Sequence, residues 1–182
     1  MATKHFLGWV ERQARCLRGK LDLAPLSILD PYQLADTLGA HIISPRDVLG
    51  MPSDDLRQLL HDDANGWSGG SVRLPTGQWL IVLNPTHPDT RKRATLMEEL
   101  SHLFLDHKPC QIMKIDGRLS FRSYKKSQET EAYWVGAAAL LPLNLMTHAQ
   151  TNGVAREVIA HQHRVSVSLV IFRERVTGIS LG

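Results

Sequence analysis

Apolar residues recur every three or four positions along several stretches of the chain, which is the spacing of one helix face. In residues 4–19 the apolar positions form one stripe and charged residues the other, which predicts an amphipathic helix. Asp30 and Pro31 are typical of a helix start and Gly39 of a helix end, so a second helix is predicted between them. Further helices are predicted over residues 53–62, 91–106, 127–141, 143–151, 154–163 and 167–176.

Strand character is confined to the middle of the chain. It occurs in residues 41–44, 71–74 and 78–84. The turn at residues 75–77 predicts a hairpin between the last two segments. Asp116-Gly117 is the strongest short hairpin signal and predicts a second hairpin, formed by residues 111–115 and 118–122. Helices surrounding a small antiparallel sheet indicate an α+β fold and not a βαβ series.

Composition narrows the class of protein. The 182 residues are 43% hydrophobic and 21% charged, values typical of one soluble globular domain. The longest apolar stretch, residues 132–143, is far shorter than the roughly 20 residues that cross a membrane, and no export signal is evident, so a cytoplasmic location is predicted. A formal charge of +3 is too small to indicate a dedicated nucleic-acid binder.

The sharpest chemical signal is the segment Glu98-Glu99-Leu100-Ser101-His102. Residues four apart share a helix face, so Glu98 and His102 can point at one ion while Glu99 reaches an attacking water. This is the HExxH pattern of metallopeptidases with glutamate in place of the first histidine. Such a site needs a third protein ligand. The next helix offers Glu129 or Glu131, which lie about 200° apart around the helix axis, so only one of them can face the ion.

Several other segments share a resemblance with one family. Together with the helix that carries Glu98 and His102, they resemble segments of the ImmA/IrrE family of metallo-endopeptidases. The segments occur in the same order as in the family and span residues 28–178. The matching segments are Asp30–Gly39, Ile81–Asn84, Arg91–Leu96, Glu129–Pro142 and Val165–Gly178.

The resemblance carries expectations about fold and function. It implies a zincin-like α+β domain over residues 1–182 in which His102 and Glu129 bind a divalent metal and Glu99 is the general base. It also implies a protein or peptide substrate, typically a helix-turn-helix transcriptional repressor that is cut by limited proteolysis.

One departure from the family pattern concerns a metal ligand. Glu98 stands where the family usually has a ligand histidine, and we predict Glu98 as a ligand in its place. Two carboxylates and one imidazole cancel the charge of a divalent ion, so a water at the site would be less acidic than at an ordinary zinc centre. Oxygen ligands also favour manganese relative to zinc. The sequence therefore predicts either a weak or partner-activated peptidase, or a pseudo-peptidase that binds a regulator without cutting it.

Three other features allow a structural or a functional interpretation. His107 is predicted to lie off the His102 face, as a capping residue at the helix end. Residues 154–178 have helix-turn-helix spacing, so they either complete the core or bind DNA through their arginines. A basic stretch either docks an acidic protein segment or protects a hairpin edge; it comprises Lys108, Lys114, Arg118, Arg122, Lys125 and Lys126.

Overall fold

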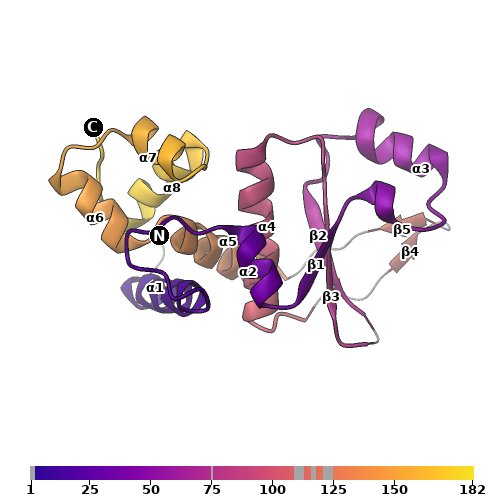
Figure 1. The fold of residues 1–182 in the computed structure, drawn as a ribbon, viewed down its shortest axis with the longest axis horizontal. Coiled ribbons are helices and arrows are strands. Elements are labelled where there is room, and N and C mark those ends of the chain that lie inside the picture. Colours follow the sequence, from indigo (N-terminus) through magenta and orange to yellow (C-terminus); the bar gives the residue numbers. More distant parts are fainter. Residues whose placement is uncertain (1–2, 75, 109–112, 116–117, 121–124) are drawn as a thin grey trace.

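A computed structural model describes residues 3–74, 76–108, 113–115, 118–120 and 125–182 (Figure 1). The helices are α1 (Lys4–Gly19), α2 (Pro31–Thr37), α3 (Ser53–Arg57), α4 (Asp89–Phe104), α5 (Lys126–Leu140), α6 (Leu143–Thr151), α7 (Arg156–Gln162) and α8 (Val167–Thr177). The strands are β1 (Ala40–Ile43), β2 (Gly69–Arg73), β3 (Trp79–Leu83), β4 (Met113–Ile115) and β5 (Arg118–Ser120). A 3-10 turn, Pro45–Asp47, precedes α3, and a π-helical turn, Gln58–Asp62, follows it. This order confirms the predicted α+β class.

The main sheet has three strands in the order β1-β3-β2. β2 and β3 form the predicted antiparallel hairpin, but β1 runs parallel to β3. The expectation of a purely antiparallel sheet is therefore wrong. The reason is the connection: the chain passes through α3 and β2 between the two strands, so it enters β3 in the direction in which it left β1. β3 is the central strand, and its residues Ile81, Val82 and Leu83 are buried.

β4 and β5 form a separate antiparallel pair, as the second predicted hairpin requires. Its turn at residues 116–117 lies outside the described residues, as do the side chains of Lys114, Arg118 and Arg122 of the basic stretch. Within the part of the chain that the structure describes, no helix has the length and apolar character needed to span a membrane.

Helix α4 lies between the main sheet and α5 (Figure 1). Its buried residues Leu96, Met97 and Leu100 belong to the hydrophobic core. The contact with α5 is close because α5 presents Gly136 there. A Cβ atom on Gly136 would lie 3.2 Å from the carbonyl group of Met97 and 3.3 Å from Ser101 Oγ. The absence of a side chain thus allows the two helices to approach one another.

The C-terminal helices α6 to α8 pack together beside α1 and α5 (Figure 1). Ile159, Val165 and Leu169 lie in the common hydrophobic core, so these helices contribute to it. Arg156, Arg164 and Arg173 of this region form ion pairs within the chain, whereas Arg175 is exposed. Arg156 pairs with Glu174, and Arg164 with Asp89.

Arg173 is fully buried, which removes it as a contact for DNA. Its Nε donates to the carbonyl oxygen of Leu141, and its guanidinium forms an ion pair with Glu11 of α1. The sequence offered this residue as a possible phosphate contact, and the structure contradicts that interpretation. Charge spacing alone could not reveal it, because the partner lies at the other end of the chain.

Candidate metal centre

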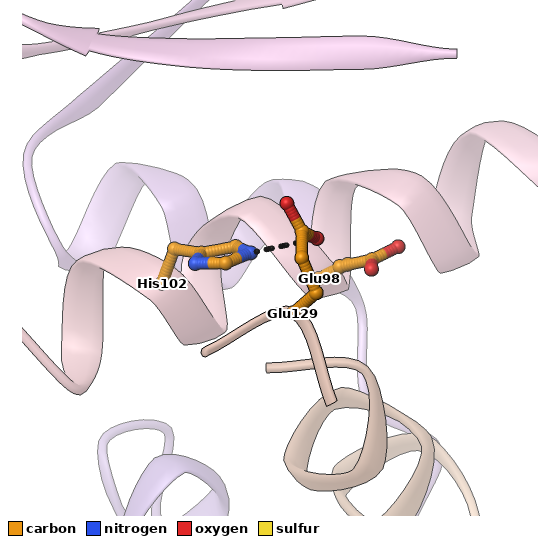
Figure 2. Close-up of side chains that lie close together, drawn as sticks. All are labelled: Glu98, His102 and Glu129. Carbon is orange, nitrogen blue, oxygen red and sulfur yellow. Dashed lines mark ion pairs between the residues drawn. The ribbon is translucent and has the colours of Figure 1, made fainter. Parts of the chain in front are cut away.

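Three side chains predicted as metal ligands lie together at the contact between α4 and α5. Glu98 and His102 come from successive turns of α4, and Glu129 comes from the first turn of α5 (Figure 2). Each offers one ligand atom within 4.8 Å of the others, and His102 Nε2 lies 3.6 Å from Glu129 Oε2. Ligand atoms around a bound zinc are about 3.3 Å apart. Small side-chain rotations would therefore bring this set to bonding distance.

The helix contact explains why these residues meet. Glu129 lies two helical turns before Gly136, so both residues face α4 from the same side of α5. The close approach at Gly136 brings this face of α5 against the turns of α4 that carry Glu98 and His102. His102 is only 1% exposed, whereas the side chain of Glu129 is 41% exposed. The cluster thus has a buried histidine, while the two glutamates are half-buried and accessible from solvent.

Glu99, the predicted general base, lies beside the cluster and is buried. Its carboxylate receives a hydrogen bond from Ser71 of β2, while burial raises its pKa to about 7 despite that bond. Its Oε2 atom has no hydrogen-bond partner among the described residues. A buried carboxylate oxygen without a partner is costly, and a water molecule at the cluster would supply one.

The electrostatics of the cluster favour a cation. Burial, and then the neighbouring carboxylates of Glu99 and Glu129, raise the pKa of Glu98 to about 8. Burial, and then His107, lower the pKa of His102 to about 3, so its ring is neutral and keeps a lone pair for a metal. Carboxylate oxygens and one neutral imidazole nitrogen form a donor set that suits a divalent ion. The residues present therefore fit such an ion.

His107 is the residue that sequence reasoning misplaced. It is buried, its Nδ1 lies 3.0 Å from Nδ1 of His102, and its Nε2 lies 3.1 Å from Oε2 of Glu131. The prediction that it lies off the His102 face is wrong, because Asp106 adopts a positive φ of 52° and turns the chain back over α4. The backbone N–H of His107 then donates to the carbonyl oxygen of His102. Aspartate tolerates this conformation, which was the one available signal.

The two glutamates of α5 are separated as their spacing requires. Glu129 faces His102 Nε2, and Glu131 faces His107. Glu131 thus has a partner that was not foreseen. The two residues contact different members of the same histidine pair.

Comparison with protein families gives a match over the region that contains the candidate metal centre. The family described as IrrE N-terminal-like domain, a peptidase family (M78), matches residues 51–175, from just before α3 into α8. No curated protein matched the chain. The matched region contains the whole cluster, and the family carries a metal-dependent, peptidase-like role. The chain therefore belongs to the IrrE N-terminal-like domain family of metallopeptidases.

Proposed function

We propose that this chain is a metal-dependent endopeptidase in which Glu98, His102 and Glu129 hold a divalent ion and Glu99 is the general base. The observation that carries the proposal is the convergence of three ligand atoms within 4.8 Å of one another. The partnerless oxygen of Glu99 beside them supports the role of the base. Zinc or manganese is the proposed ion.

The chemistry follows from the side chains. A bound divalent ion would polarise the scissile carbonyl and acidify a water molecule. Glu99 Oε2 accepts the proton of the attacking water and later delivers it to the leaving amine. Burial raises the pKa of the Glu99 carboxyl, which makes its carboxylate a better proton acceptor than an exposed glutamate. Ser71 keeps the carboxylate of Glu99 tied to β2 while it does so.

The proposed substrate is a helix-turn-helix transcriptional repressor that is cut at one or a few sites. The support for this class is the resemblance of the chain to ImmA/IrrE peptidases, together with a match to a peptidase family, whose substrates are proteins. An extended segment of such a repressor is the expected form in which it meets the site. The proposed place of action is the cytoplasm.

Glu98 favours a second candidate function, a pseudo-peptidase that binds the repressor without cutting it. A ligand set of two carboxylates and one imidazole leaves a divalent ion without net charge, so it activates water less than a set of two imidazoles and one carboxylate. Hydrolysis would then be slow or absent while the binding surface remained.

The decisive experiment compares the wild type with Glu99→Gln. Each protein is loaded with zinc or manganese and incubated with repressors encoded near its gene, and fragments are followed by mass spectrometry. We expect Glu99→Gln to keep its metal and lose cleavage by about 100-fold or more. The exposed Glu157→Gln is the matched control and should cut like the wild type. Cleavage by Glu99→Gln at the wild-type rate would contradict the assigned base, and stable binding without cleavage by the wild type would favour the pseudo-peptidase.

The ligand assignment has its own test in Glu98→His. The substitution adds an imidazole and removes a carboxylate, so we expect tighter zinc binding and faster cleavage. Competition with a chelator measures the affinity, and elemental analysis measures the stoichiometry. If neither the wild type nor Glu98→His binds one ion per chain, the three residues are not a metal site.

A further inference from the structure

A buried histidine, His107, and a half-buried glutamate, Glu131, lie beside the cluster and have no part in the proposed reaction. His107 is 6% exposed, and Glu131 holds its far side. The rings of His102 and His107 meet edge to face, with centroids 5.1 Å apart. His102, His107 and Glu131 thus form a continuous line of contacts. The line begins at the Nε2 atom of His102, which faces Glu129 (Figure 2).

In the contact between Nδ1 of His102 and Nδ1 of His107, one of the two nitrogen atoms carries a proton. The two Nδ1 atoms are 3.0 Å apart, a hydrogen-bond distance, so one ring donates and the other accepts. Two protonated nitrogens would repel each other at this distance, and two unprotonated ones would leave neighbouring lone pairs. A neutral imidazole has one N–H and one lone pair, so the choice at Nδ1 fixes what each ring presents at Nε2.

The contact between His107 and Glu131 decides which of the two rings donates in the hydrogen bond between the Nδ1 atoms. Glu131 as a carboxylate only accepts hydrogen bonds, so it is satisfied when Nε2 of His107 carries the proton. A neutral His107 then has a lone pair at Nδ1 and accepts from Nδ1–H of His102. His102 is consequently left with a lone pair at Nε2, the atom that faces Glu129 and the proposed ion. The opposite direction would place a proton on that atom and block it as a ligand.

We propose that Glu131 and His107 are positioning residues that hold His102 in the tautomer able to bind metal. This inference rests on the proposed function, because it assigns His102 as a ligand. Metal-bound histidines generally donate their other ring N–H to a carboxylate or carbonyl, and loss of that partner typically costs about 10- to 100-fold in metal affinity. Here a second histidine lies between the ligand and the carboxylate.

The tautomers can be observed directly in the full-length, metal-free protein. Ring 15N shifts in long-range 1H–15N spectra distinguish a protonated nitrogen from an unprotonated one. We expect His102 to be protonated on Nδ1 and His107 on Nε2. A His102 ring protonated on Nε2 in the wild type would overturn the proposal, whatever the protein does to a substrate.

Glu131→Gln tests the carboxylate. The amide has the same size but can donate as well as accept, so it no longer selects one direction. We expect a mixture of His102 tautomers and a zinc affinity about 10- to 100-fold lower by chelator competition. Glu157→Gln, exposed on α7, is the matched control and should keep both properties. Unchanged tautomers and unchanged zinc affinity in Glu131→Gln would overturn the role of the carboxylate.

Two variants of His107 separate hydrogen bonding from packing. His107→Asn places an acceptor oxygen near the position of Nδ1 but removes the link to Glu131, whereas His107→Phe fills the ring volume without any acceptor. We expect zinc affinity to fall in the order wild type, His107→Asn, His107→Phe. A residue that merely packs would give the reverse order for the two variants, and that result would overturn the proposal. Because zinc affinity and tautomers are measured without a substrate, absence of peptidase activity would not affect these outcomes.

Discussion

At the scale of single residues, the centre concentrates acidic groups where burial opposes their charge. The carboxyl groups of Glu98 and Glu99 have pKa values raised to about 8 and about 7, with burial the largest cause for each. Without a cation these groups hold protons at a pH where exposed glutamates are ionised. The metal-free folded protein therefore binds protons at these two carboxyl groups, and a bound cation would stabilise their ionised forms instead.

The raised pKa of Glu98 predicts how the stability of the metal-free protein depends on pH. Glu98 keeps its proton up to about pH 8 when folded, but its ordinary pKa is 4.5, so the folded state holds more protons in this interval. The free energy of unfolding therefore falls as pH rises. Because the lowered pKa of His102 acts in the opposite direction below 6.5, the test interval lies between 6.5 and 8.

Through Glu98 we expect the metal-free protein to lose about 1 kcal/mol of unfolding free energy per pH unit in this interval, and Glu99, whose pKa is raised to about 7, adds a smaller loss at the lower end. Urea denaturation at several pH values, with a chelator present, measures the slope. Glu98→Gln should remove most of it, and Glu157→Gln should keep it. An equal slope in Glu98→Gln would show that the carboxyl of Glu98 is not the source.

At the scale of elements, the contact between α4 and α5 sets the geometry of the centre. Gly136 faces the carbonyl of Met97 and leaves no room for a larger side chain. Gly136→Val should push α5 away from α4, which separates Glu129 from His102 and lowers metal affinity. Crowding of this kind typically costs about 1–3 kcal/mol of stability. Zinc competition and thermal unfolding measure the two effects.

The control for that substitution is Gly19→Val at the end of α1. A Cβ atom there has no neighbour within 4 Å, so we expect wild-type metal affinity and a stability equal to or slightly above that of the wild type, because valine has a higher helix propensity than glycine. If Gly136→Val bound zinc like this control, the helix contact would not determine the spacing of the ligands.

Local sequence signals predicted the helices and strands well, whereas features that depend on the path of the chain or on a single turn were missed. Asp30 caps α2 as its sequence indicated, with its side chain accepting from the N–H of Tyr32, and the helical spacing of α4 placed Glu98 and His102 on neighbouring turns. The parallel pairing of β1 depends on the path of the chain through α3 and β2, which periodicity does not encode. The place of His107 depends on one positive φ just beyond a helix, where helical geometry no longer applies.

At the scale of the whole molecule, Arg173 connects distant segments. It joins α8 to Glu11 of α1 and to the carbonyl of Leu141 at the end of α5. These contacts hold the C-terminal helices against the helix that carries Glu129. Arg173 therefore has a structural role in a place where sequence spacing offered a nucleic-acid contact.

Arg173→Ala tests this role. It removes the cation that pairs with the partly buried carboxylate of Glu11, leaving only the N–H of Leu143 as a donor to it, and it opens a cavity. Breaking a buried ion pair typically costs about 3–5 kcal/mol. We expect a clear fall in the temperature of unfolding by calorimetry. Arg175→Ala, at an exposed position of the same helix, should change stability by less than about 0.5 kcal/mol. Similar stability of the two variants would contradict the structural role.

The left-handed turn at Asp106 limits which sequences can preserve the histidine pair. Only glycine, asparagine and aspartate adopt a positive φ at little cost, and a β-branched residue there would disfavour the turn that returns His107 to His102. A directed-evolution experiment that selects for tighter zinc retention should therefore accept few amino acids at position 106. A tolerant surface loop, by contrast, would accumulate changes at every position.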